Sequence, residues 1–210
     1  MKRFLILFSA LILLLGLFGV ANATTITNSS YAVGNNYTSP YSGVTVYTFD
    51  NGTLYSGMSV GDGGAVVSGN LVGSYNPPKG VTSTDATPYL AVTGTETIML
   101  PSAVNNYFGL WWGSEDSWNN ITFYDKDVVV YSYDGIMGSN AGSVLANGST
   151  QDLYVNFLDL PNFDKVVITS PQAAFEADNL AFGTVPEPAT MLLLGLGLIG
   201  LAGARRKFKK

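Results

Sequence analysis

The sequence predicts an all-β protein with a single antiparallel β-sandwich or jelly-roll domain between two hydrophobic ends. Three observations favour this fold class: short runs rich in β-branched and aromatic residues, turn-forming clusters between the runs, and no convincing helical period of apolar residues in the middle region. Many short strands at this spacing are typical of antiparallel sandwiches and jelly rolls. The chain of 210 residues has no cysteine, so packing of the core must hold the domain together.

The predicted strands follow one another along the region between residues 24 and 184. They cover residues 43–49, 95–100, 121–124, 128–133, 153–158 and 165–169. Clusters of Asp, Asn, Gly and Pro separate them at residues 50–52, 61–64, 76–80, 134–135 and 147–148, and these residue types favour turns. Residues 24–40 are expected to form a loosely held arm, and residues 77–87 a long loop.

An alternating segment around Trp111 and Trp112 indicates a further strand. Alternation places Phe108, Leu110 and Trp112 on one face and Tyr107 and Trp111 on the other. One of the two tryptophans is therefore expected in the core. The other is expected to point outward or to lie under a loop.

The first 23 residues have the pattern of a signal peptide. A short basic segment precedes an apolar run over residues 4–20, and Ala21-Asn22-Ala23 then forms a cleavage signature of small residues. The alternative is an uncleaved anchor helix. Export is the prediction, with Ala21 and Ala23 marking the cleavage site.

The C-terminal segment, residues 185–210, has three parts. Pro186-Glu187-Pro188 precedes an uncharged span of 16 residues, 189–204, and a basic tail over residues 205–210 that includes Arg205, Arg206 and Lys207. A helix of this length reaches about 24 Å at ~1.5 Å per residue. The span can therefore cross a thinned bilayer with its basic residues on the cytoplasmic side.

These three parts in this order resemble the PEP-CTERM sorting signal. The resemblance implies a surface protein exported by a Gram-negative bacterium that makes extracellular polymer and biofilm. It also implies that Pro186, Glu187 and Pro188 are recognised by exosortase, a membrane protease-transpeptidase, so that the membrane span is temporary. An ordinary tail anchor is the alternative. A second resemblance, to segments of PEP-CTERM surface proteins, covers residues 107–124 and 154–182 and is carried by the runs at residues 107–125 and 175–180. It implies a sandwich domain without assigned catalysis.

Charge and composition exclude several function classes. The region between the two ends has three lysines against fourteen acidic residues, a net charge of −11, which repels nucleic acid. The absence of histidine and cysteine excludes a Ser-His-Asp triad, thiolate zinc sites and cysteine nucleophiles. No pattern selects a pair of carboxylates for glycoside hydrolysis. We therefore expect no enzymatic activity.

Two groups of residues are candidates for ligand binding. Asp50, Glu176 and Asp178 could supply oxygen ligands to a structural calcium ion, or they could be solvated carboxylates in and near turns. Trp112 and Trp118 could form a flat apolar platform for a sugar, with core packing as the alternative.

The sequence thus predicts an exported, exosortase-processed protein of the cell surface or extracellular matrix, with a structural or adhesive role. Its predicted processing partners are signal peptidase and exosortase, and its C-terminal helix holds it in the membrane before processing. One alternative is a carbohydrate-binding jelly roll with structural calcium and an extracellular polysaccharide as partner. Another is a polysaccharide hydrolase that uses a carboxylate pair.

Overall fold

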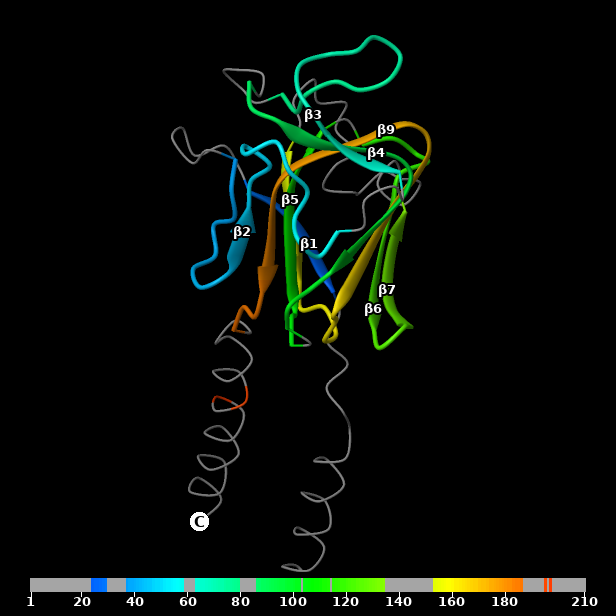
Figure 1. Cartoon of the computed structure of the whole chain (residues 1–210). Coiled ribbons are helices and arrows are strands. Elements are labelled where there is room, and N and C mark those ends of the chain that lie inside the picture. The colour runs from blue at the N-terminus through cyan, green and yellow to red at the C-terminus, as the bar shows by residue number, and fades with distance from the viewer. Residues whose placement is uncertain are drawn as a thin grey trace, which may run out of the picture.

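The structure, a computed structural model, describes residues 24–29, 37–58, 63–79, 86–102, 104–113, 115–134 and 153–186, together with Gly195 and Gly197. Within these residues nine strands form one antiparallel sheet (Figure 1). The strands are β1 (Thr25–Ser29), β2 (Thr45–Tyr47), β3 (Gly64–Val67), β4 (Tyr89–Met99), β5 (Tyr107–Gly113), β6 (Asn120–Asp125), β7 (Val128–Asp134), β8 (Leu153–Leu158) and β9 (Lys165–Gly183).

Strand β9 connects the two halves of the sheet. Its first part, residues 165–170, pairs with β4 and β6, and its last part, residues 175–183, pairs with β4, β5 and β2. Pro171 lies between the two parts, and proline cannot donate a hydrogen bond to a neighbouring strand. Gly94 of β4, at φ +105°, stands where the β4–β9 register shifts, a conformation that favours glycine. As Figure 1 shows, β9 turns over here and returns toward the end from which it started.

The two halves of the sheet pack against each other through aromatic side chains. Phe123 of β6 lies 5.6 Å from Phe108 of β5 and 5.5 Å from Phe157 of β8, measured between ring centroids. No pairing joins β6 to β5 or to β8 among the described strands, so these contacts cross the interior. The predicted all-β antiparallel class is confirmed. The nine strands form one folded-over sheet instead of two separate ones, and a sandwich or jelly roll is not established.

A second, smaller core covers the other face of β5 and β8. It contains Tyr107, Trp111, Tyr154 and Ala181, and Tyr37 stacks on Trp111 with ring centroids 4.2 Å apart. Trp112 belongs to the main core instead, so the two tryptophans lie on opposite faces of β5, as the alternation along residues 107–112 predicts. Trp111 is only 4% exposed because the segment from Tyr37 to Val44 covers it.

The structure corrects several predicted boundaries. Residues 25–29 form β1 where a loose arm is predicted, because they pair with β8. Gly64 begins β3 where a turn is predicted, and β4 and β9 extend well beyond residues 95–100 and 165–169. Pairing with distant strands, not local residue preference, stabilises these parts.

The two predicted hydrophobic ends lie almost wholly outside the described residues. Gly195 and Gly197 have helical backbone, and the rest of residues 189–204 and all of residues 1–23 are not described. Among the residues that are described, no helix has the length and apolar character needed to cross a membrane.

Candidate functional site

Both ends of the strand region lie at one end of the molecule, which we call the exit end (Figure 1). It consists of Thr25 and residues 99–102, 104–106, 125–128, 159–165 and 184–186. The loops that precede β5 and β9, the β6–β7 turn and the last residues of β9 meet there. The residue that follows the predicted signal-peptide site and the residue that precedes Pro-Glu-Pro are therefore close in space.

The pairing of residues between neighbouring strands gives the distance between the two points at which the chain enters and leaves the sheet. Thr25 of β1 pairs with Leu158 of β8, and the next pair along β8 joins Phe157 to Phe108 of β5. Tyr107, one residue before Phe108, pairs with Gly183 of β9. Thr25 and Gly183 are thus three strand spacings apart in one row, about 14 Å at ~4.8 Å per spacing.

Asn106 fixes the point at which the chain leaves the sheet. Its side-chain amide donates to the backbone oxygen of Val185 at 2.9 Å, and its side-chain oxygen accepts from the Val185 backbone N–H at 2.7 Å. The backbone N–H of Asn106 also donates to Gly183 at 3.0 Å, and Thr184 donates its hydroxyl to the Val104 carbonyl at 2.7 Å. Val185 packs against the second core. The folded part therefore reaches the residue directly before Pro186.

The loop that carries Asn106 is itself held by the connection between β8 and β9. Asn105, 2% exposed, donates its side-chain amide to the Phe163 carbonyl at 2.9 Å, and the Phe163 N–H donates back to the Asn105 carbonyl at 3.1 Å. The Leu160 N–H donates to the Asn106 carbonyl at 3.1 Å. Because these bonds are made within buried backbone, Asn106 has little freedom to move away from Val185.

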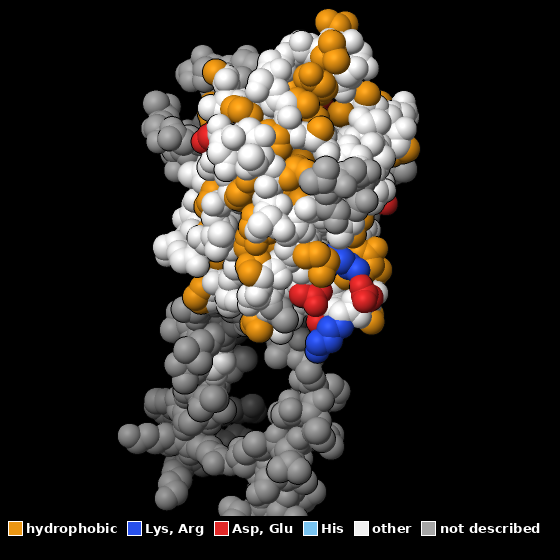
Figure 2. All heavy atoms as spheres, viewed as in Figure 1, with side chains coloured by type: hydrophobic (Ala, Val, Ile, Leu, Met, Phe, Trp, Pro, Cys, Tyr) orange, Lys and Arg blue, Asp and Glu red, His pale blue; other side chains and the backbone are white. Residues whose placement is uncertain are grey.

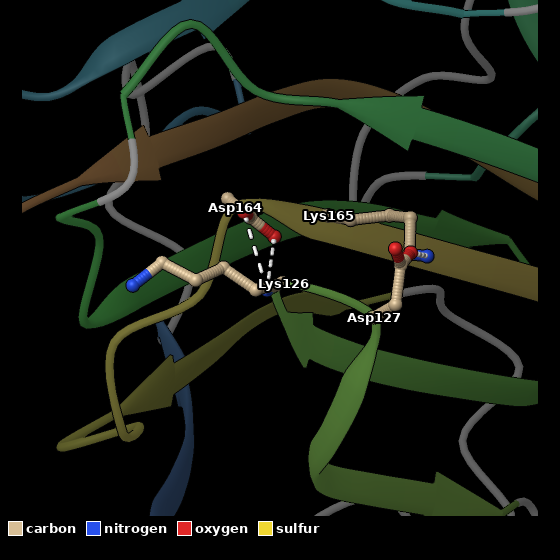
Figure 3. Close-up of polar contacts among 4 residues, drawn as sticks. All are labelled: Lys126, Asp127, Asp164 and Lys165. Atoms are coloured by element: carbon tan, nitrogen blue, oxygen red, sulfur yellow. Dashed lines mark hydrogen bonds and ion pairs between the residues drawn. The ribbon is translucent and has the colours of Figure 1, made fainter.

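Charged residues gather at the β6–β7 turn of the exit end. Lys126 and Asp127 both have positive φ, 48° and 68°, which is the geometry of a two-residue type I′ hairpin turn. The Lys126 N–H donates to both Asp164 carboxylate oxygens at 3.3 Å, and the Lys165 ammonium pairs with Asp127 (Figure 3). Figure 2 shows that most charged side chains visible on that face gather near this end.

A hydroxyl network lies beneath the second core. The Tyr107 hydroxyl donates to Asn156 Oδ1 at 2.8 Å and shares a hydrogen bond of 2.8 Å with Ser39. Gly109 allows this arrangement, because a Cβ atom there would lie 2.2 Å from the Tyr107 hydroxyl and 2.9 Å from that of Tyr154. Burial raises the pKa of Tyr107 to about 12, and burial also raises the pKa of Tyr154. Both phenols stay neutral and serve as structural hydrogen-bonding groups.

The residues predicted to bind calcium take different places. Asp50 is exposed in a turn, whereas Glu176 and Asp178 are buried at 3% and 2% exposure. Glu176 accepts the Asn76 N–H at 3.0 Å, and Asp178 accepts the Asn179 N–H at 2.7 Å. Among the described residues no group of three or more acidic side chains is placed to hold a metal ion. The calcium site stays a prediction without geometric support.

The two tryptophans predicted to form a sugar platform also differ. Trp112 is 2% exposed, stacks on Phe175 with ring centroids 4.5 Å apart, and contacts the edge of Tyr133. Neither of its faces is open to a ligand in this structure. Trp118 is half-buried in the β5–β6 loop, and its indole N–H has no partner among the described residues.

The same β5–β6 loop carries a partly buried acid, Glu115. The Tyr133 hydroxyl donates to its carboxylate at 2.6 Å. Burial raises the pKa of Glu115, the Tyr133 hydrogen bond opposes the rise, and the charge of Asp116 adds to it. Burial likewise raises the pKa of Asp116. This pair lies at the end of β5 opposite Tyr107 and thus away from the exit end.

Sequence reasoning missed Asn106 and Glu96. Glu96 is fully buried, accepts the Gly64 N–H at 3.0 Å, and occupies the space that a side chain at position 64 would need. A charged residue inside an alternating strand is the signal that could have identified it. Asn106 offers no such signal, because its partner Val185 lies 79 positions away.

Of the predicted sorting and cleavage residues, the structure describes Pro186 alone. Pro186 is exposed and directly follows Val185, whose backbone is hydrogen-bonded to the Asn106 side chain. Glu187, Pro188, Arg205, Arg206 and Lys207 of the sorting signal, and Ala21 and Ala23 of the signal-peptide site, lie outside the described residues.

Comparison with known proteins identifies the segment that follows β9. Residues 184–207 match the PEP-CTERM protein-sorting motif. No curated protein and no solved structure matches the chain. The match begins at Thr184, one residue before Val185, so the exit end is the site where the folded part meets the signal. The predicted recognition is confirmed: this chain carries a PEP-CTERM sorting motif, which marks an exported surface protein processed by exosortase.

Proposed function

We propose that this protein is a structural or adhesive component of the cell surface or extracellular matrix. Signal peptidase removes residues 1–23, and exosortase then releases the folded β domain from its C-terminal membrane span. The observation that carries the proposal is the sorting motif at residues 184–207, attached without a linker to the last strand.

The buried acids support a role without catalysis. Glu96, Glu176 and Asp178 each accept a hydrogen bond from a backbone N–H. A carboxylate held in this way satisfies buried backbone donors and fixes loops to the sheet. In the part of the chain that the structure describes, the three fully buried acidic side chains thus each bind a backbone N–H and help to hold the fold together.

An adhesive role in an extracellular polymer fits the surface of the protein. The exported region has a net charge of −11, which favours solubility of the released domain and repels polyanions such as nucleic acid. Partners of the domain are then neutral or cationic polymers, which include extracellular polysaccharide.

Fractionation combined with an attachment assay tests the proposal. With exosortase present, we expect the protein at the cell surface or in the matrix, and without exosortase in the inner membrane. Deletion of the gene should reduce attachment or matrix cohesion, and the full chain should restore it. A protein that stays in the cytosol, or a deletion without effect on either property, contradicts the proposal.

A further inference from the structure

We propose that the exit end is a membrane-facing surface, which lies against the lipid headgroups of the bilayer until exosortase cuts the tail. The proposal rests on the proposed function for the existence of the anchored precursor. It goes further by assigning which surface of the domain meets the membrane.

The two hydrogen bonds between Asn106 and Val185 form what we call the clamp. The first argument is the length of chain between this clamp and the membrane span. Asn106 holds Val185, and the apolar span begins at Ala189. Four residue steps reach at most about 14 Å even when fully extended. The linker crosses one headgroup layer, which is about 5–7 Å thick and takes up that much of its length. The clamped end can therefore leave only a thin layer of water between itself and the headgroups.

The second argument is the position of the N-terminal exit. Thr25 lies in the same row as Gly183, and the apolar run of the predicted signal peptide ends at Val20. Five residue steps reach about 18 Å at most. A precursor that still has its signal peptide is thus tethered twice at the same end, which favours one orientation of the domain on the bilayer.

The exposed side chains of the exit end suit a headgroup layer. Val104, next to Thr184, is 57% exposed, and Val128, the first residue of β7, is 65% exposed. Val104 precedes β5, whose side chains are all buried, and Val128 is followed in β7 by Val129, which is 53% exposed. Apolar side chains of this kind are stabilised at the boundary between headgroups and acyl chains.

The charged side chains of the exit end do not attract it to the lipid headgroups. Lys126 and Lys165 lie at the exit end, and so do Asp125, Asp127, Asp159 and Asp164, which leaves this end slightly negative. Lys165 is already paired with Asp127. We therefore expect the contact with the membrane to depend on the tether and on apolar side chains, and to change little with salt.

The absence of cysteine makes a site-specific test straightforward. The full-length precursor is reconstituted without exosortase in vesicles of phosphatidylethanolamine and phosphatidylglycerol whose headgroups carry a nitroxide quencher. Val104→Cys and Val128→Cys are labelled with a small fluorophore. Val72→Cys is the matched control, because Val72 is 93% exposed in the connection between β3 and β4. Figure 1 shows β3 at the end of the sheet opposite the exit end, and Val67 of β3 pairs with Tyr89, the residue of β4 farthest from Met99.

We expect loss of most of the fluorescence at positions 104 and 128, and almost none at position 72. Adding Asn106→Ala to Val104→Cys releases the clamp and lengthens the tether, so quenching at position 104 should fall. Equal quenching at all three positions, or stronger quenching at position 72, overturns the proposal.

Exosortase added to the same vesicles separates this proposal from the proposed function. If the tail is cut but the three labels were quenched equally before the cut, the surface assignment fails and the processing stands. If positions 104 and 128 are quenched selectively but exosortase does not cut, the surface assignment is supported and the processing fails.

Discussion

The side chain of Asn106 and the backbone of Val185 form a reciprocal pair of hydrogen bonds, 2.9 Å and 2.7 Å long, where the sheet ends and the sorting motif begins. Val185 lies two residues beyond the end of β9. The two bonds give its backbone N–H and carbonyl the hydrogen-bonding partners that a neighbouring strand supplies within the sheet. The residues held by the sheet therefore extend to Val185, directly before Pro186.

Replacing Asn106 with alanine should loosen this boundary. Asn106→Ala removes both hydrogen bonds, so we expect a loss of about 1–2 kcal/mol in the free energy of unfolding. The Val185 amide should exchange hydrogen faster than in the unmodified chain. Thr184→Val is the control, because it removes only the exposed bond to Val104 and should cost about 0.5 kcal/mol or less. Unchanged exchange at Val185 in Asn106→Ala would contradict the clamp.

Gly109 should tolerate no side chain. Gly109→Ala places a Cβ atom 2.2 Å from the Tyr107 hydroxyl, and we expect a destabilisation of about 1–3 kcal/mol from overpacking. Tyr107→Phe removes the clashing oxygen, so the alanine should cost less in that background. Urea unfolding of the two single variants and the double variant measures the coupling. Equal costs in both backgrounds would show that the hydroxyl is not the cause.

Alkaline pH should unfold the protein through its buried phenols. Burial raises the pKa of Tyr107 to about 12, whereas an unfolded tyrosine ionises near its ordinary value of ~10. The unfolded state therefore loses protons first, and stability present below about pH 10 is lost as the pH rises toward 12. Phenolate absorbance, followed together with unfolding, measures this. Ionisation of every tyrosine near pH 10 in a chain that stays folded is the outcome against it.

Ionisation of Glu115 should lower the free energy of unfolding as the pH rises from acid to neutral. Burial raises its pKa in the folded state, so the folded state binds more protons than the unfolded state in the window above the ordinary value of ~4.3. Stability is then greatest below this window and falls through it. Glu115→Gln keeps an oxygen for the Tyr133 hydroxyl and should remove this part of the slope. Urea unfolding between pH 4 and 7 compares the two chains, and identical slopes would show that Glu115 makes no contribution.

Local patterns predicted the strands that alternate strongly. The predicted runs at residues 121–124, 128–133 and 153–158 match β6, β7 and β8 closely, because β-branched and aromatic residues there alternate or run together. The faces of β5 also follow from alternation, with Trp111 and Trp112 in separate cores.

Features that depend on distant partners were beyond local reasoning. The segment of β1 is polar and becomes a strand only by pairing with β8, and β9 continues past Pro171 because neighbouring strands continue beside it. Alternation places Glu176 and Asp178 on one face of a late strand, but it does not identify their partners. Their N–H donors include Asn76 and Phe49, 100 and 129 positions away. The sorting signal, by contrast, is a contiguous motif and could be identified from the sequence.

The intact mass of the form found at the cell surface tests the central claim most directly. The account predicts a chain that starts near Thr24 and has lost its C-terminal apolar span and basic tail, and it predicts that this C-terminal loss requires exosortase. A surface form that still ends in the basic residues 205–210 while exosortase is active would contradict the account.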